Sequence, residues 1–539
     1  MTDWNYADLF EIVADQIPTA PALVHGERRQ TWAETEARAN GLAASLLATG
    51  VAQQDKIAHY LYNCPEYMES TVALLKVGLV PVNTNYRYGD DELAYLWENA
   101  DAVGVIFHGT FAERVERLRG RVKGVRTWIW VDDGTGPCPE WAVPYESMAG
   151  TTTGRVAAPW GRSGDDLYLL YTGGTTGMPK GVMWRQDDLV GRLNAASPVR
   201  FDESKGLQGV RDAMRSPGPS LLPACPLMHG TGAFTSLNVL STGGSVVTLP
   251  GRHFDPVALL DAVVREHVNV IVIVGDAFAK PILAALDASP GRWDLSSVFA
   301  MISSGVMWSE EVKEGLFRHH PTFLAVDAFS SSEAIGMGTS VSSGAETAHT
   351  AEFRLGDDAR VLLEDGRDVT PGSGEVGVLA LGGRNPLGYY KDETKTAGTF
   401  RVIGGRRYVV PGDFATVDSD GAVHLLGRGS VCINTGGEKV YPEEVEEAVK
   451  LFPGVADAAV VGLPDERWGE TVCAVVEPAD GARIDERALV ADVKAKLASY
   501  KAPRYVHVVA SIARSPSGKL DYGRLRSEAM DWAAGRAAP

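Results

Sequence analysis

The spacing of apolar positions predicts amphipathic helices near both ends of the chain. In residues 31–50, leucines recur on one side of a helix that begins with a capping box of Thr31 and Glu34. In residues 441–452, a proline at the first helical position, acidic residues after it and apolar residues four apart predict another helix. We expect the first helix to have a purely structural role.

Continuous apolar runs predict buried strands. Residues 167–171 and 270–274 are rich in β-forming side chains, and glycine follows soon after each run. Helical and strand patterns alternate through most of the chain, which favours an α/β fold. Functional side chains are expected in the loops that follow such strands.

The chain is too long for a single ordinary core, since 539 residues favour two or more domains. Near residue 427 the pattern changes, and a smaller unit of about a hundred residues follows, which is within the usual range of domain sizes. We therefore expect domains at residues 1–427 and 428–539, the second able to fold and move as a body.

Composition and charge narrow the classes of function. With 45% hydrophobic and 22% charged residues, the chain is typical of a globular protein, and its formal net charge of −18 argues against a nucleic-acid partner. Five scattered cysteines without a CxxC pair indicate neither a disulfide framework nor a zinc site. The N-terminus lacks a signal-peptide pattern, and no apolar run reaches membrane-spanning length. We expect a cytoplasmic protein and leave open both a homodimer and peripheral membrane contact.

The segment after the first predicted strand is rich in residue types that bind phosphate. Residues 172–181 contain four glycines, three threonines and one lysine. Glycine lets backbone N–H groups approach an anion, threonine hydroxyls donate hydrogen bonds, and lysine adds charge. A Walker A loop is disfavoured, because Pro179 precedes the lysine and Gly181 follows it. An ordinary turn is the alternative for such a loop.

This loop closely resembles the signature of the adenylate-forming superfamily, which contains acyl-CoA synthetases, luciferases and the adenylation domains of peptide synthetases. Four further segments resemble motifs of that family in the same order, namely residues 328–333, 408–413, 436–446 and 516–519. Each segment alone has an ordinary explanation, but five matches in order do not arise readily by chance. The resemblance covers nearly the whole chain.

The chain departs from the family's motifs at four positions. Ser330 and Ser332 stand where glycine and threonine are usual, and Pro411 occupies the place of a threonine. Ser430 stands where many members have aspartate or lysine, two residues after Arg428, and the resemblance implies that the small domain pivots at residues 428–430. The location of that hinge follows from the resemblance, whereas its energetics do not.

The resemblance implies a fold and a nucleotide site. The implied fold is a large N-terminal adenylate-forming domain, with mixed α/β subdomains and a β-barrel-like part, and a small mobile α+β C-terminal domain. The residues implied for ATP or AMP are Thr172, Gly173, Gly174, Thr175, Thr176, Gly177, Lys180, Ser304, Gly305, Asp327, Ala328, Phe329, Ser332, Asp413 and Arg428. Phe329 would stack on adenine, Asp413 and Arg428 would bind the ribose, and Glu333 with Thr172 would hold Mg²⁺.

The resemblance also implies the course of catalysis. Attack of a carboxylate on the α-phosphate of ATP brings two anions together, so the reaction needs neutralisation of charge and alignment. Lys519 is implied as the catalytic lysine, which leaves Lys180 as a charge of the phosphate loop. Coenzyme A would accept the acyl group in a second step, along a channel that contains Gly436, Gly437 and Glu438. The small domain would rotate between the two steps.

The acid site is implied at residues 228–232, 274–278 and 303–305. Its members are His229, Gly230, Gly275, Phe278 and Ser303. A lone histidine is more often a packing residue, but the residues around His229 match a position where the family often has histidine beside the acyl carboxylate. Glycines at 230, 232, 275 and 305 suggest room for a long or bulky acid. Residues 275–281 and 428–434 resemble actinobacterial ligases of steroid side-chain acids, which favours a fatty or steroid acid.

Three other functions stay open. In the first, the enzyme activates an aryl acid. In the second, it transfers its acyl group to an amine or a carrier protein. The third is a silent nucleotide-binding protein, against which Lys519, Glu333 and Asp413 together argue. A serine hydrolase and a zinc hydrolase are disfavoured because neither Gly-x-Ser-x-Gly nor His-Glu-x-x-His occurs.

Overall fold

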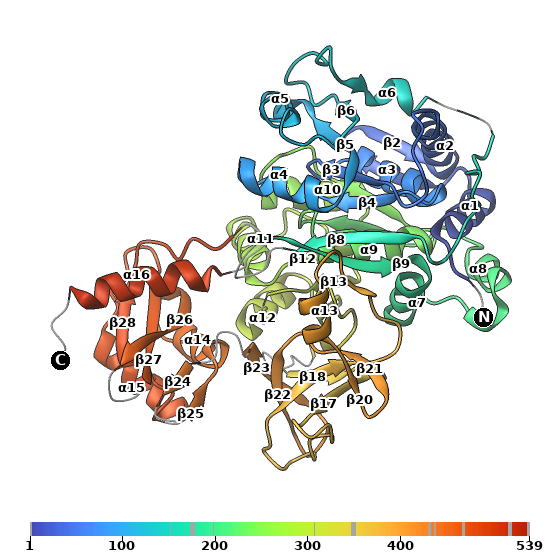
Figure 1. Ribbon diagram of the computed structural model, residues 1–539. Helices are drawn as coiled ribbons and strands as arrows, with labels where there is room; N and C mark the ends of the chain where they lie inside the picture. The colour runs from blue at the N-terminus through green and yellow to red at the C-terminus, as the bar shows by residue number, and fades with distance from the viewer. Residues whose placement is uncertain are drawn as a thin grey trace. The chain divides into compact units, whose positions relative to one another are not determined.

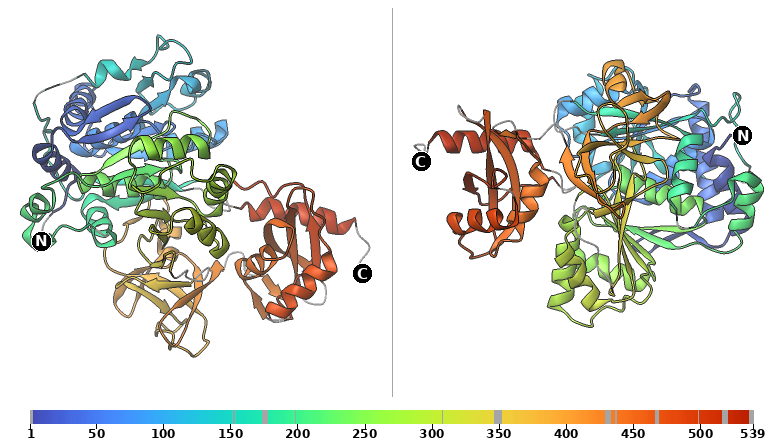
Figure 2. Two further views of the ribbon diagram at one scale, coloured as in Figure 1. Left: turned by 180° about the vertical axis from the view of Figure 1, so that it is seen from behind. Right: turned by 90° about the horizontal axis from the view of Figure 1, so that it is seen from below.

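The chain folds into two compact units (Figures 1 and 2). The structure, a computed structural model, describes residues 3–150, 152, 154–172, 178–197, 199–306, 308–345, 352–428, 433–435, 438–465, 469–497, 499–515 and 520–535. The first unit takes residues 1–350, 382–401 and 407–409, and the second takes residues 351–381, 402–406 and 410–539. Among the described helices, none combines the length and the apolar character that crossing a membrane requires.

An eight-stranded sheet carries the first predicted strand. In spatial order it contains β19 (Gly388–Tyr389), β9 (Lys180–Arg185), β8 (Leu167–Thr172), β4 (Val80–Asn83), β3 (Lys56–Tyr60), β5 (Ala102–His108), β6 (Thr127–Val131) and β7 (Val143–Pro144). From β8 to β7 neighbouring strands are parallel, while β9 and β19 run antiparallel to their neighbours. Helices α3 (Pro65–Lys76), α4 (Asp90–Asn99) and α5 (Ala112–Arg119) connect the parallel strands. The prediction of a buried strand at 167–171 is confirmed.

A second, largely parallel sheet of the first unit carries the other predicted strand. Its order is β2 (Arg28–Thr31), β1 (Pro21–His25), β11 (Ser245–Thr248), β10 (Ser220–Pro223), β12 (Val270–Ile273), β13 (Ala300–Ser303), β14 (Leu324–Phe329) and β15 (Gly338–Ser342). Helices α9 (Gly230–Ser241), α10 (Pro256–Arg265), α11 (Asp276–Ala288) and α12 (Glu310–His319) alternate with the parallel strands. The four residues of β12 are all buried, as the continuous apolar run predicts.

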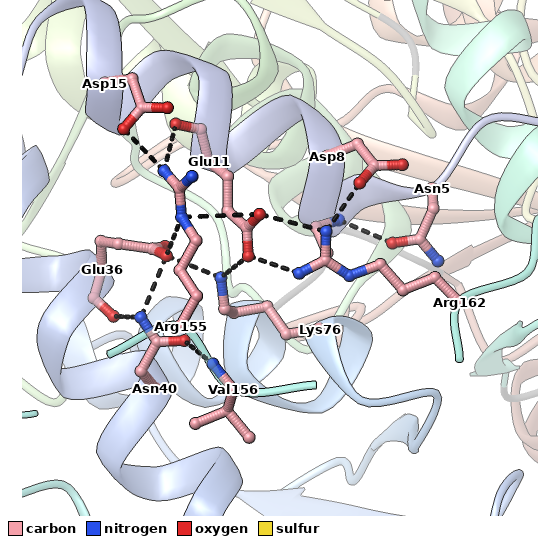
Figure 3. A network of polar contacts seen from close by, with 11 residues as sticks. Asn5, Asp8, Glu11, Asp15, Glu36, Asn40, Lys76, Arg155, Val156 and Arg162 are labelled. Atoms are coloured by element: carbon pink, nitrogen blue, oxygen red, sulfur yellow. Dashed lines mark hydrogen bonds and ion pairs between the residues drawn. The ribbon is translucent and has the colours of Figure 1, made fainter. Parts of the chain in front are cut away.

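Helices α1 (Tyr6–Gln16), α2 (Trp32–Ala48) and α3 meet at a buried lysine of α3. Further helices of the first unit are α6 (Tyr145–Met148), α7 (Gln186–Ala196) and α8 (Leu207–Ala213). The predicted capping box is confirmed, because Thr31 and Glu34 exchange both hydrogen bonds at the start of α2. Figure 3 shows the Lys76 ammonium between the carboxylates of Glu11 and Glu36, at 2.7 Å from each. The Lys76 side chain is 0% exposed.

The second unit contains two sheets. An antiparallel sheet includes β16 (Glu352–Leu355), β17 (Ala359–Leu362), β18 (Gly377–Leu381), β22 (Asp413–Val417) and β23 (Val423–Arg428). A five-stranded sheet contains β25 (Glu438–Val440), β24 (Ile433–Thr435), β27 (Gly469–Pro478), β26 (Val455–Asp465) and β28 (Tyr505–Val508). Helices α14 (Pro442–Lys450), α15 (Glu486–Lys496) and α16 (Tyr522–Ala534) complete this small α+β part. The remaining elements are α13 (Glu393–Thr399), which belongs to the first unit, and β20 (Phe400–Ile403) and β21 (Arg406–Val409), which contain residues of both units.

The helix predicted at 441–452 is confirmed as α14. Tyr441 is its N-cap residue and Pro442 stands at its first position, where the missing N–H costs nothing. Val445 and Val449 are buried in the core of the small α+β part. The expected domain boundary at 427/428 lies inside the second unit and stays a prediction, and Ser430 lies outside the described residues.

Candidate active site

Four parallel strands end beside the residues that the sequence assigns to the acid and the nucleotide. β10, β12, β13 and β14 are neighbours in the sheet, with Ile273 paired to Ser303 and Ser303 to Asp327. Ligands of open α/β sheets bind outside the carboxyl ends of the strands. Gly275 and Gly305 each lie two residues beyond one of these ends, so two of the predicted acid segments lie at the same edge of the sheet.

Close contacts confirm that the acid segments are adjacent. Gly275 has φ +53° and donates its N–H to the Ser303 hydroxyl at 2.9 Å. Gly305 has φ +95°, and a Cβ built on it would lie 3.9 Å from the Thr231 hydroxyl oxygen and 3.9 Å from a Val274 methyl. Both glycines are therefore required by backbone conformation, which explains their presence without reference to the size of the acid.

The glycines at the start of α9 serve close packing. A Cβ on Gly230 would lie 3.1 Å from a Leu170 methyl of β8, and one on Gly232 would lie 2.6 Å from the Pro226 carbonyl oxygen. The interpretation that these two glycines leave room for a bulky acid is therefore wrong. Their lack of a side chain is what lets α9 approach β8 and its own preceding loop.

His229 is half-buried at the N-cap of α9, and two asparagines hold the loop that leads to it. Its own N–H donates to the Pro226 carbonyl at 3.2 Å. Asn63 donates to the Cys225 carbonyl at 3.0 Å and accepts from the Leu227 N–H at 2.7 Å. The backbone at Cys225 and Leu227, just before the histidine, is thus held by Asn63.

Asn83 joins this loop to the strand that precedes the phosphate loop. Its amide nitrogen donates to the Met228 carbonyl at 2.6 Å and to the Tyr171 carbonyl at 2.8 Å, and its oxygen accepts from the Tyr171 N–H at 2.6 Å. Met228 precedes His229, and Tyr171 precedes Thr172, the last residue of β8. One buried amide therefore positions the predicted acid loop and the entrance of the phosphate loop.

Lys180 and Glu333, predicted for the phosphates and Mg²⁺, are brought together by Tyr389. The Tyr389 hydroxyl donates to Oε1 of Glu333 at 2.7 Å, and the Lys180 ammonium lies 5.4 Å from the centre of the tyrosine ring. Burial lowers the pKa of Lys180, and the charge of the neighbouring Lys395 lowers it further. Glu333 and Asp392 oppose this effect and favour the charged lysine.

The segment expected to contact adenine rests on a buried ion pair. Lys313 of α12 is 1% exposed and lies 2.5 Å from the Asp327 carboxylate. Burial raises the pKa of Asp327 to about 6, although the Lys313 charge acts in the opposite direction. The Asp327 carboxylate thus bonds within the protein, while Ala328 and Phe329 continue β14 towards the loop that carries Ser332 and Glu333.

Phe278 and Asp276, both near the start of α11, have contacts that hold this helix in place. Phe278 packs edge-on against Phe254, with ring centres 4.8 Å apart, and is 4% exposed within the core. Asp276 accepts the Ser309 N–H at 3.0 Å and so ties the start of α11 to the start of α12. The predicted role of Phe278 against the acyl chain stays a prediction, and the structure assigns its ring a packing partner.

The predicted ribose contacts lie in the second unit. Asp413 of β22 pairs with Arg428 of β23 in the antiparallel register, so the two residues are direct neighbours across the strands. The backbone of Glu438 begins β25. Residues Gly173, Gly174, Thr175, Thr176, Gly177, Gly436, Gly437 and Lys519 lie outside the described residues. Their roles stay predictions.

The side chains present suit Mg²⁺ that arrives with ATP. Mg²⁺ is commonly bound through one or two carboxylates together with substrate phosphates, and Glu333 and Thr172 offer oxygen ligands of that kind. In the part of the chain that the structure describes, no group of three or more histidine, cysteine or acidic residues gathers as a metal site.

Comparison with known proteins assigns both ends of the chain to one enzyme family. The model of the AMP-binding enzyme family matches residues 10–390, and that of the AMP-binding enzyme C-terminal domain matches residues 444–519. The medium/long-chain-fatty-acid–CoA/3-oxocholest-4-en-26-oate–CoA ligase of Mycolicibacterium smegmatis is 40% identical, over 96% of this chain and 95% of that protein. The 3-oxocholest-4-en-26-oate–CoA ligase of Rhodococcus rhodochrous is 40% identical, over 96% of this chain and 94% of that protein.

A solved structure agrees in fold. The ATP-bound MatB from Rhodopseudomonas palustris superimposes with a TM-score of 0.81 at 26% identity, over 98% of this chain and all of that chain. The predicted α/β architecture with a small α+β C-terminal part is therefore confirmed. Because the first family model spans well over half of the chain and the relatives are similar from end to end, the chain belongs to the family of AMP-binding enzymes.

Proposed function

We propose that this enzyme is an AMP-forming acid–CoA ligase for fatty acids and for bulky acids of the steroid side-chain type. The observation that carries this proposal is the 40% identity, over 96% of the chain, to ligases named for fatty acids and for 3-oxocholest-4-en-26-oate. The clustering of the predicted acid segments at the carboxyl edge of four parallel strands supports it.

The proposed reaction has two steps. In the first, a carboxylate oxygen attacks the α-phosphorus of ATP, and the bond to pyrophosphate breaks, which leaves acyl-AMP. In the second, the thiol of CoA attacks the acyl carbon, gives up its proton, and displaces AMP. Mg²⁺ bound with ATP would neutralise phosphate charge.

Each group of residues has a place in this scheme. Lys519 stabilises the negative charge shared by the carboxylate and the α-phosphate, as electrostatic catalysis requires. The Thr172 loop, Lys180 and Glu333 bind the β- and γ-phosphates. His229 lies beside the acyl carboxylate, and the loop at Gly436 and Gly437 receives CoA after the small domain rotates about Ser430.

A panel of acids tests the proposal. Purified enzyme is given ATP, Mg²⁺ and CoA with octanoate, palmitate, 3-oxocholest-4-en-26-oate, benzoate or ferulate, and AMP formation is measured with and without CoA. We expect CoA-dependent AMP formation with the fatty and steroid acids and little with the aryl acids. A preference for aryl acids would overturn the substrate class.

The acceptor is tested separately with acyl-AMP. Formation of acyl-CoA from acyl-AMP and CoA supports the ligase, whereas acyl transfer to an added amine or carrier protein, but not to CoA, would contradict it. Absence of ATP–pyrophosphate exchange with every acid would favour a silent nucleotide-binding protein. The proposed setting is the cytoplasm, which agrees with the free thiols of Cys64, Cys138, Cys225 and Cys473 among the described residues.

A further inference from the structure

Tyr389 contacts three segments, namely strand β9 next to Lys180, helix α13 and the loop that carries Glu333. It belongs to β19, which pairs with β9 so that Tyr389 is opposite Val182, two residues beyond Lys180. Its N–H donates to the Thr396 hydroxyl at 2.9 Å, which ties it to α13. The tyrosine is only 7% exposed, and its ring packs edge-on against that of Phe400, with ring centres 5.7 Å apart.

The hydroxyl of Tyr389 forms a hydrogen bond with the carboxylate of Glu333. The O–H donates to Oε1 at 2.7 Å across a separation of 56 residues. The backbone beside Glu333 is held as well, because the Trp184 indole donates to the Ser332 carbonyl at 3.0 Å. Tyr389 on β19 and Trp184 on β9 therefore hold the loop that carries Glu333.

A hydrogen bond from a neutral hydroxyl changes what Glu333 can do. It fixes one carboxylate oxygen and leaves the negative charge on the side chain, whereas a lysine or arginine in that place would neutralise it. Bonds of this kind, made to a ligating group by residues that do not touch the metal, orient the ligand and typically change metal affinity 10- to 100-fold. The tyrosine ring also borders the Lys180 ammonium, which carries the opposite charge of the same site.

We infer that Tyr389 is a positioning residue that holds Glu333 and Lys180 in register for the metal-bound β- and γ-phosphates of ATP. This inference rests on the proposed function, in which Glu333 and Lys180 bind those phosphates. It predicts that loss of one hydroxyl group weakens binding of the metal–nucleotide complex while the fold and the acid site persist.

The chain offers a matched control at the next residue. The Tyr390 hydroxyl also donates to a carboxylate at 2.7 Å, but that carboxylate is Asp101. Tyr389→Phe and Tyr390→Phe therefore remove the same atom and the same type of bond from adjacent positions. Their difference isolates the effect on Glu333 from a general loss of a tyrosine hydroxyl.

The test measures binding of Mn²⁺·ATP in the absence of any acid, by the loss of the free Mn²⁺ signal in electron paramagnetic resonance. We expect Tyr389→Phe to raise the dissociation constant about tenfold and Tyr390→Phe to leave it unchanged, since a hydrogen bond to a charged group contributes about that factor. In exchange assays, the KM for pyrophosphate should rise with Tyr389→Phe while the KM for the acid stays constant.

A double-mutant cycle separates positioning from a general structural role. If Tyr389 acts through Glu333, Tyr389→Phe has no further effect on Mn²⁺·ATP binding in a Glu333→Gln background. Equal dissociation constants for the two Tyr→Phe variants, or an undiminished effect of Tyr389→Phe in that background, would overturn the inference. The binding measurement contains no acid and no CoA. Its result can therefore be interpreted even if the proposed acid or CoA specificity is wrong.

Discussion

The ammonium group of Lys76 lies 2.7 Å from Oε1 of Glu11 at a place where the lysine side chain has no contact with solvent. The second carboxylate partner, Glu36, lies at the same distance, and Arg155 and Arg162 form further ion pairs with Glu11 (Figure 3). Burial raises the pKa of Glu11, but Arg162 and Lys76 outweigh it, so the pKa falls below its ordinary value of 4.5. The network thus joins α1, α2 and α3 through charges that depend on one another.

Lys76→Met is expected to destabilise the protein strongly. Removal of the buried ammonium leaves Glu11 and Glu36 with only partly exposed arginines as ion-pair partners. Loss of one partner from a buried ion pair typically costs about 3 to 5 kcal/mol of unfolding free energy. The control is Lys391→Met, because Lys391 also lies 2.7 Å from a carboxylate, that of Asp101, but is 45% exposed. An exposed pair contributes about 1 kcal/mol or less. Urea unfolding of both variants measures the difference, and equal losses would contradict the assignment.

Lys519→Ala is expected to separate the two half-reactions. In the proposed function the lysine acts only while the carboxylate attacks the α-phosphate, so acid-dependent ATP–pyrophosphate exchange should fall on the order of 100-fold or more. Acyl-CoA formation from acyl-AMP and CoA should persist. Lys494→Ala, an exposed change on α15, serves as the control. Unimpaired pyrophosphate release in Lys519→Ala would refute the catalytic role.

The Lys313–Asp327 pair is expected to make stability depend on pH. The pKa of Asp327 is about 6 in the folded protein against an ordinary 3.8, because burial disfavours the carboxylate. As pH rises through this window, the unfolded chain loses the proton first, so the contribution of Asp327 to the unfolding free energy falls. The difference in unfolding free energy between the wild type and Asp327→Asn should therefore be smaller at pH 7 than at pH 4.5. If this difference in unfolding free energy instead grew as the pH rose, the prediction would be wrong.

Asn83→Asp is expected to weaken binding of both ATP and the acid. Its carboxylate would face the carbonyl oxygens of Met228 and Tyr171, to which the amide now donates. Leaving such buried groups unsatisfied costs about 1 to 3 kcal/mol each, so both KM values should rise about tenfold. Asn63→Asp disturbs the acid loop alone and should raise only the KM for the acid. A change in one KM alone for Asn83→Asp would contradict its double role.

The sequence predicted those features that depend on local signals. The capping box at Thr31 and Glu34 and the proline at the start of α14 specify helix ends within one turn. The buried strands β8 and β12 follow from unbroken apolar runs, since both faces of each are covered. The family motifs assigned roles to Thr172, Lys180 and Glu333 because each motif is a short segment of the sequence, and these roles stay predictions.

Contacts between distant segments left no such signal. Asp276 meets Ser309 across 33 residues and Tyr389 meets Glu333 across 56, and only the pairing of strands and the packing of helices bring them together. Asn83 is one residue at the end of a short apolar strand, and its role appears only when two loops lie within reach of one amide. The glycines near α9 misled for the same reason, because empty space and close packing both favour glycine.

The amide of Asn83 has a thermodynamic consequence for how each substrate would change the affinity for the other. Because it bonds to Met228 and to Tyr171 at once, any shift of the acid loop on binding changes the energy of the strand that enters the phosphate loop. Such linkage is reciprocal, so whatever factor the acid imposes on the affinity for ATP, ATP imposes on the affinity for the acid. If the proposed function holds, this one side chain would couple the binding of the two substrates before any bond between them forms.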